Sequence, residues 1–139
     1  MFYKKIPNGY IVRLEAGEEV ISSLSEFAKK EKILGGFLFG LGAIKDATLG
    51  YFDVKNREYI KKTFDDEYEI SSLVGDIYYF EGKPDVHAHV TLSGRDFKVI
   101  GGHLFSATVT GTGEFFICVS SDMLQRKKDP QTGLNLLDL

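Results

Sequence analysis

Hydrophobic residues recur at helical spacing in one segment of the chain, residues 18–30. The apolar positions that would share one face of a helix there are Val20, Leu24, Phe27 and Ala28. Glutamates precede these positions and lysines follow them, which matches the polarity of the helix dipole. The pattern predicts one amphipathic helix over residues 18–30 with a face that packs against a sheet.

After Gly36 the pattern changes to short runs of β-forming residues interrupted by glycine and turn residues. A further β-rich run precedes the helix at residues 10–14. The strands expected after the helix cover residues 37–43, 47–53, 58–64, 68–80, 86–92, 97–100 and 106–120. The sequence therefore predicts a single α+β domain over residues 1–139, a mostly antiparallel sheet of about seven strands with one main helix packed on it.

Two glycine clusters interrupt these runs, Gly40 with Gly42 and Gly101 with Gly102. Glycine inside a strand costs stability unless the backbone needs a special angle or a close approach. Each cluster is compatible with a bulge, a tight corner or a backbone that faces a ligand, and the structural explanations are preferred.

Composition and charge restrict the function. The 139 residues include 43% hydrophobic residues and no apolar run of membrane-spanning length, so no membrane association is expected. The amino-terminal segment has no secretion pattern, which predicts a soluble cytoplasmic protein. The single cysteine, Cys118, lies in an apolar run and is interpreted as a small buried residue. A net charge of −3 argues against a domain that wraps nucleic acid by charge alone, and the short lysine clusters are interpreted as solvated surface.

Residues 122–139 are expected to form a turn and a tail. Leucine is frequent near the end, at Leu134, Leu136, Leu137 and Leu139. Leucines are poorly placed in water, so the tail is expected to dock on the protein's own core or on a neighbouring subunit.

The three histidines carry the main chemical signal. His87 and His89 lie on a strand with alternating character, so both side chains point to one polar face, about 6 to 7 Å apart at Cα. A turn near Gly94 and a returning strand would bring His103 beside them. Three imidazoles with an open fourth position suit zinc first and other divalent ions that favour imidazole second. The alternative is a solvent-facing His pair with an unrelated third histidine.

A hydrolytic zinc site would also need a base, and three carboxylates are candidates. Glu114 could act as the base, while Asp85 and Asp96 could hold an imidazole in position. The preferred interpretation of each is an ordinary surface acid. No serine-hydrolase, phosphate-binding, dinucleotide-binding or paired-cysteine motif is present.

Four segments of the chain, in order and spacing, resemble the plants-and-prokaryotes-conserved (PCC, also PPC) domain along nearly its whole length. They are residues 40–43 (GLGA), 69–75 (EISSLVG), 84–89 (PDVHAH) and 101–104 (GGHL). Residues 132–134 (TGL) are similar to the prokaryotic members. The resemblance implies a compact sheet with one helix, a homotrimer, and a metal site of His87, His89 and His103 near the subunit contact.

Plant members of this family carry AT-hook segments that bind DNA, but this chain has no Arg-Gly-Arg-Pro core and no basic arm. The resemblance therefore implies a regulatory, homo-oligomeric protein that binds metal and is associated with DNA directly or through a partner. The alternative is a zinc-dependent hydrolase or other metalloenzyme acting on a small molecule. A purely structural ion between strands or subunits would need a fourth protein ligand, which Asp85 or a neighbouring chain could supply.

Overall fold

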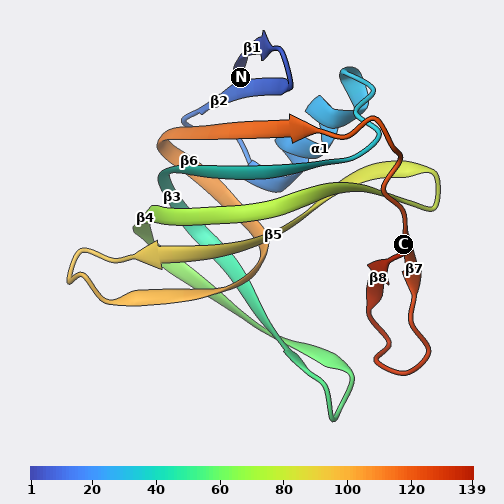
Figure 1. Ribbon diagram of the computed structural model, residues 1–139. Helices are drawn as coiled ribbons and strands as arrows, with labels where there is room; N and C mark the ends of the chain where they lie inside the picture. The colour runs from blue at the N-terminus through green and yellow to red at the C-terminus, as the bar shows by residue number, and fades with distance from the viewer.

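Antiparallel strands make up most of the protein, and one helix packs against them (Figure 1). The computed structural model describes residues 1–139. In chain order the elements are β1 (Phe2–Ile6), β2 (Gly9–Glu15), α1 (Val20–Lys30), β3 (Gly36–Asp53), β4 (Glu58–Phe80), β5 (Lys83–Ser93), β6 (Val99–Val119), β7 (Arg126–Lys128) and β8 (Asn135–Leu137). The α+β class with a mostly antiparallel sheet and one main helix is confirmed.

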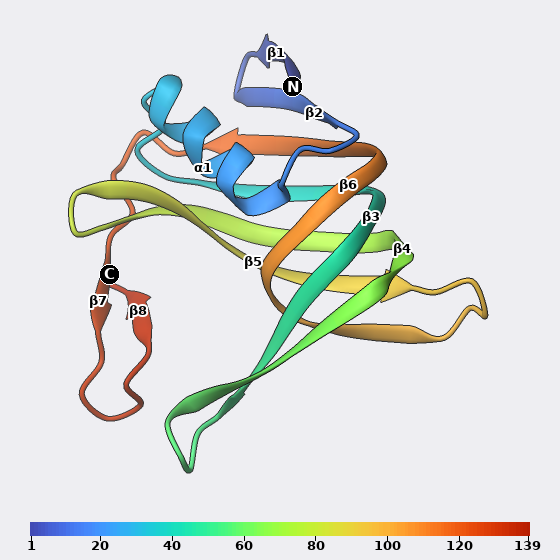
Figure 2. The same cartoon turned by 180° about the vertical axis from the view of Figure 1, so that it is seen from behind.

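The main sheet has six strands in the order β1-β2-β6-β3-β4-β5, and β5 also pairs with the first part of β6. Because of this extra pairing, β3, β4, β5 and β6 close on one another over part of their length. Helix α1 covers one face of the sheet, as seen from behind in Figure 2. At 11 residues, it is neither long nor apolar enough to cross a membrane.

The core lies between α1 and the inner face of the sheet. It contains 24 buried hydrophobic residues, and the strands contribute to it by alternation that is interrupted at the register shifts. All four apolar positions expected on the helix face are buried there: Val20, Leu24, Phe27 and Ala28. They pack with strand residues such as Leu38, Leu73 and Phe115, which are wholly inaccessible to solvent.

The helix begins two residues later than the sequence predicts, because Glu19 caps it. The Glu19 carboxylate accepts hydrogen bonds from the backbone N–H groups of Ile21 and Ser22, at 3.1 and 2.7 Å. It also accepts one from the N–H of Ala107 in β6, at 3.1 Å. Glu18 lies outside the helix, where it pairs with the terminal amino group of Met1 at 2.8 Å.

Several expected strands are parts of longer ones. The segments predicted at 37–43 and 47–53 form the single strand β3, and those at 58–64 and 68–80 form β4. The residues between the predicted segments are accommodated by a register shift between Lys45 and Ala47, and a second shift lies between Gly40 and Gly42, so the chain bends without leaving the sheet. Of the segment predicted at 97–100, residues 99 and 100 begin β6, while residues 97 and 98 precede the strand. We refer to the projecting end of the β3–β4 hairpin, residues 46–64, as the arm.

Three sequence-based expectations change at the surface. The prediction of a buried Cys118 is wrong, because the residue follows buried Ile117 and alternation turns its side chain outward. The edge strand β1 was not expected. The tail is ordered as the β7–β8 hairpin, which contacts β4. Leu134 is partly buried within that hairpin, whereas the terminal Leu139 is fully exposed.

Candidate metal centre

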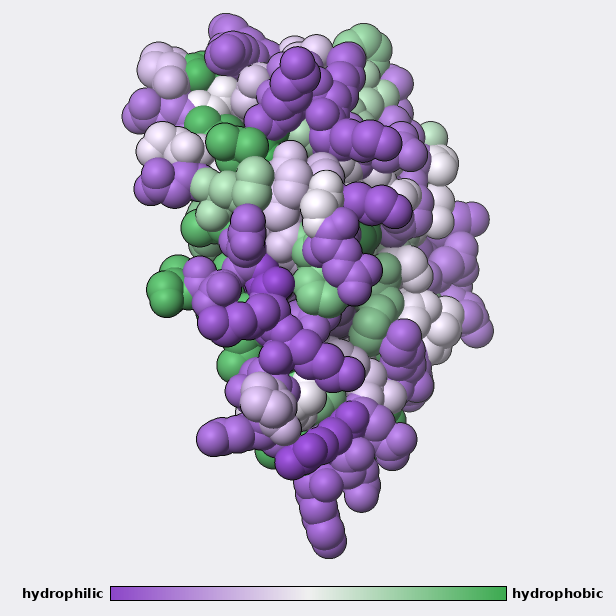
Figure 3. Space-filling model, turned by 90° about the vertical axis from the view of Figure 1, so that its right-hand side faces the viewer, coloured by the Kyte–Doolittle hydropathy of each residue, from purple (hydrophilic) through white to green (hydrophobic).

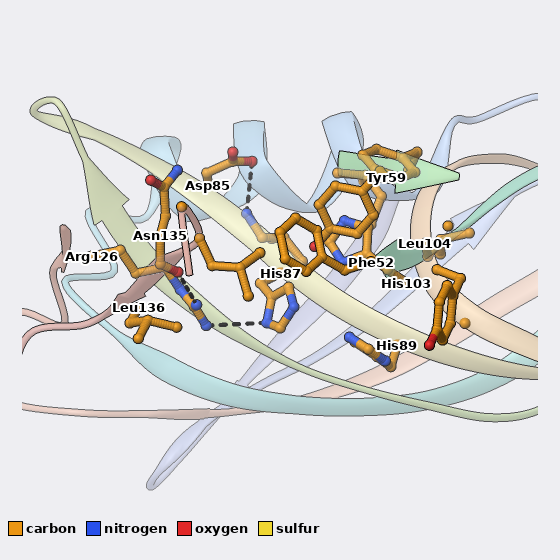
Figure 4. Close-up of a pocket in the computed structure, with 18 of the residues that line it drawn as sticks. Phe52, Tyr59, Asp85, His87, His89, His103, Leu104, Arg126, Asn135 and Leu136 are labelled. Atoms are coloured by element: carbon orange, nitrogen blue, oxygen red, sulfur yellow. Dashed lines mark hydrogen bonds between the residues drawn. The ribbon is translucent and has the colours of Figure 1, made fainter. Parts of the chain in front are cut away.

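The three histidines lie together at the point where β5 pairs with β6 (Figure 4). His89 and His103 are direct partners across the two strands, and His87 lies two residues from His89 on the same face of β5. One side-chain nitrogen from each ring lies within 4.8 Å of the others. The return of His103 to the pair, which the sequence suggested, is therefore present.

Local sequence explains why these rings face one another. In β5 the alternate residues Val86, Ala88, Val90 and Leu92 are buried in the core. Their alternation leaves the two histidines of β5 on the opposite face. On β6, Gly102 allows the backbone of β3 to approach closely, since a Cβ there would lie only 2.8 Å from the carbonyl oxygen of Gly50. This glycine therefore serves strand packing next to the histidines.

A carboxylate that the sequence analysis did not single out holds one of the rings. Asp76 on β4 is the register partner of His87, and its Oδ2 lies 3.1 Å from His87 Nδ1. Arg126 from β7 contacts both oxygens of Asp76 through Nη2, at 2.9 and 2.8 Å. The sequence offered one signal for this role, an acidic residue between the buried Leu73 and Ile77 in an otherwise apolar stretch. Which residue this acid contacts depends on the strand register and could not be read from the sequence.

The Asp76 carboxylate selects the form of His87 that can bind an ion. With the proton on Nδ1, that nitrogen donates to Asp76 and the Nε2 lone pair is free for a metal. Arg126 Nη2 also lies 3.1 Å from His87 Nδ1, but accepting that bond would place the proton on Nε2. Burial opposes ionisation of Asp76, yet hydrogen bonds from His87 and Arg126 hold its pKa below the usual value. The carboxylate therefore stays charged and favours the metal-binding tautomer.

The environment of His89 and His103 favours their neutral forms. Burial, reinforced by neighbouring positive charges including Lys61 and Arg126, lowers the pKa of His103 to about 4. Burial and the adjacent His87 lower the pKa of His89 as well. Neutral imidazole is the form that binds metal ions, so both rings are ready to bind near pH 7.

The residues present fit a metal ion. The Nδ1 atom of His103 is buried and has no hydrogen-bond partner, which is rare for a buried polar atom. Tetrahedral zinc needs ligand atoms about 3.3 Å apart, so the nitrogens of His87, His89 and His103 would need only small side-chain rotations. No carboxylate belongs to this group of converging ligand atoms.

The three carboxylates considered from the sequence do not join the histidines through hydrogen bonds. Glu114 lies on the other half of β6, paired in register with Arg13 and Leu41, which places it away from the cavity that holds the histidines. Asp96 lies in the β5–β6 turn and binds Lys98 at 2.9 Å. Asp85 lines the cavity, but it accepts hydrogen bonds from Ser25 and Tyr78.

A cavity of about 920 Å³ opens over the histidines. Its walls come from α1, the arm, β4, β5, β6 and the C-terminal hairpin, and include Phe52, Tyr59, Tyr78, Phe105, Leu134 and Leu136. Figure 4 shows Phe52 and Tyr59 next to His103, with Arg126 and Leu136 on the side of His87. Neither the aromatic wall nor the contribution of Arg126 was expected from the sequence.

This chain belongs to the Plants and Prokaryotes Conserved (PCC) family. The model of the PCC domain matches residues 1–121. No curated protein matches the chain.

Solved structures are similar over almost the whole chain. Two proteins described as a "putative DNA-binding protein" come from Bacteroides thetaiotaomicron and Ralstonia eutropha. They are 39% and 34% identical, with TM-scores of 0.95 and 0.91. Each match covers 99% of this chain and 96% or 95% of the other. A metal-containing protein from Archaeoglobus fulgidus is 34% identical with a TM-score of 0.89, over 100% of this chain and 99% of that one.

The lowered pKa of His103 predicts that the metal-free protein loses stability as the pH falls from 6.5 to about 4. In that range the unfolded chain takes up a proton on His103 and the folded chain does not, so acid favours unfolding. Urea unfolding at several pH values should show the loss, and His103→Gln should make it smaller. If the free energy of unfolding falls with pH by the same amount in wild-type protein and in His103→Gln, this account is wrong.

Proposed function

We propose that this protein is a zinc-binding homotrimer with a regulatory, DNA-associated role. The observation that carries the proposal is the convergence of His87, His89 and His103 in a member of the PCC family. The similar proteins support it in part, since two are named for DNA binding and a third is described as metal-containing.

Zinc is the ion that these ligands favour. Three neutral imidazoles leave one tetrahedral position open, which is typical of zinc sites that bind water or a ligand and is unlike closed structural sites. The Asp76 carboxylate behind His87 is the kind of partner that orients a metal-binding histidine. When bound, the ion would supply a positive charge and an exchangeable position in an otherwise balanced cavity.

An apolar surface supports self-association. On the face of the sheet opposite α1, exposed hydrophobic side chains lie next to one another across three strands: Phe37, Phe39, Leu41, Val74 and Phe116. The rings of Phe39 and Phe116 are stacked, with their centroids 5.4 Å apart and an angle of 4° between their planes. We call these five residues the outer patch. Hydrophobic residues also reach the surface among polar ones on the side seen in Figure 3. Clustered exposed aromatics are typical of protein contacts.

The outer patch borders the histidines. Val74 is the register partner of both Phe39 and His89, so patch and candidate metal centre are continuous on one face. A second subunit on the patch would therefore lie beside the ion. Three subunits is the number that the resemblance to the PCC domain implies.

Direct DNA contact would need a local basic surface, because the chain carries a net charge of −3 and has no basic arm. The C-terminal end of α1 and the strand β1 provide the best candidate. Lys30 lies 5.0 Å from the ring of Tyr3, whose hydroxyl donates to Glu31, and Lys29 and Lys5 are exposed nearby. In a trimer these lysines would be repeated three times.

A metal-dependent enzyme is the second candidate. The open fourth position beside a cavity of about 920 Å³ favours it, since zinc activates bound water for hydrolysis. Against it, Glu114 lies elsewhere and Asp76 is committed to His87 and Arg126. Asp85 lines the cavity and would have to give up its bonds to Ser25 and Tyr78 to act as a base.

Untagged wild-type protein should contain about one zinc ion per chain by elemental analysis. The double variant His87→Ala, His89→Ala should contain almost none, because one imidazole cannot hold the ion. A matched double variant, Glu114→Ala with Asp96→Ala, should keep the metal. If wild-type protein contains no metal even after supplementation with zinc, the proposed metal centre is wrong.

In sedimentation equilibrium the wild-type protein should have a molecular mass three times the chain mass of 15.6 kDa. Phe39→Glu should sediment as a folded monomer, because a charge at the centre of the outer patch cannot be buried without a partner. Phe97→Glu is the matched control, since Phe97 is 87% exposed at a distant turn. A Phe39→Glu protein that remains trimeric would place the contact elsewhere.

Binding to mixed genomic duplexes should weaken steeply with salt. Each phosphate contact contributes about 0.9 to the slope of log affinity against log salt concentration. Replacing Lys29 and Lys30 by alanine should lower that slope by about 2 for each subunit that contacts the duplex, whereas Lys83→Ala with Lys98→Ala should not. If wild-type protein binds no duplex at low salt, DNA association is indirect.

A further inference from the structure

The cavity over the histidines is larger than an ion and its water require. At about 920 Å³ it lies within the size range of sites for small organic molecules, about 300 to 1,000 Å³. Ten of its 21 lining residues are hydrophobic. Such a site favours a ligand with an apolar body and a few polar groups.

Aromatic rings form one continuous wall of this cavity. The rings of Phe52 and Tyr59 in the arm lie 5.0 Å apart, and Tyr59 lies 5.1 Å from both Phe105 and His103. Phe105 in turn lies 4.5 Å from His103. The wall therefore begins at a proposed metal ligand and continues away from it, which suits a flat ring attached to a metal-binding group.

The charges in the cavity favour an anion at the ion. Two arginines, Arg57 and Arg126, and two carboxylates, Glu58 and Asp85, line it and balance one another. Asp76 behind Arg126 adds one negative charge, and Lys61, whose Nζ lies 3.6 Å from the centre of the Phe105 ring, adds one positive charge, so the surroundings remain balanced. Imidazole ligands carry no charge when they bind metal. A divalent ion would thus keep most of its positive charge, and an anionic oxygen at its open position would compensate it.

We propose that the cavity binds a small molecule in which a carboxylate stands next to a flat apolar ring. The carboxylate completes the coordination of the ion, and the ring lies against Phe52, Tyr59 and Phe105. This inference rests on the proposed metal site and gives the DNA-associated protein a small-molecule signal to respond to.

Cobalt in place of zinc makes ligand binding visible, because the absorption spectrum of cobalt changes with its ligands. Untagged cobalt-loaded protein should be titrated with acetate and with benzoate. Benzoate should half-saturate the spectral change at a concentration at least tenfold lower than acetate. Phe52→Ala should reduce this preference to less than threefold.

Ile60→Ala is the matched control, since Ile60 is an exposed arm residue outside the cavity and its truncation should leave the preference intact. A cobalt spectrum that responds equally to both anions would overturn the ligand assignment and leave the metal site standing. Benzoate binding to metal-free protein can be monitored by tyrosine fluorescence. If metal-free and cobalt-loaded protein bind benzoate with equal affinity, the ligand assignment is also overturned. Absence of any cobalt spectrum would remove the metal site and the inference with it.

Discussion

The pairing of β5 with the first part of β6 is the constraint on which the rest of this structure depends. It closes part of the sheet, places His89 opposite His103, and forms the floor of the cavity. A slip of one residue would turn the β5 histidines into the core and expose the residues of β5 that are now buried, such as Val86 and Val90. Core burial and the geometry of the site are thus fixed by the same register, and neither could change alone.

A charged network extends this constraint to the end of the chain. Arg126 from the C-terminal hairpin binds Asp76, and Asp76 holds His87. The hairpin also contributes Leu134 and Leu136 to the cavity wall. The PCC domain model ends at residue 121, whereas the similar solved structures match nearly the whole chain. Residues beyond the family model are therefore part of the site.

The two faces of the sheet carry different kinds of residues. The inner face and α1 bury the core, while the opposite face carries the outer patch and leads to the histidines. This division keeps the outer patch, the candidate metal centre and the cavity apart from the buried core. The fold itself does not specify the reaction or the partner, so function rests on the residues of the site.

The sequence alone determined the features that depend on local periodicity. Helical spacing identified the buried face of α1, and alternation in β5 placed His87 and His89 on one polar face. The histidine pattern and the glycine motifs also indicated the family, which the match to residues 1–121 confirms. These features could be predicted because they arise from neighbours a few residues apart.

The tertiary structure decided what depends on pairing between distant segments. Asp76 and Arg126 lie far apart along the chain, and only the β4–β5 register and the docked hairpin bring them to His87. The same long-range pairing separates Glu114 from the histidines and gathers the outer patch from three strands. Local pattern carries no information about which strands pair or in which register, so these contacts became visible only when the sheet was assembled.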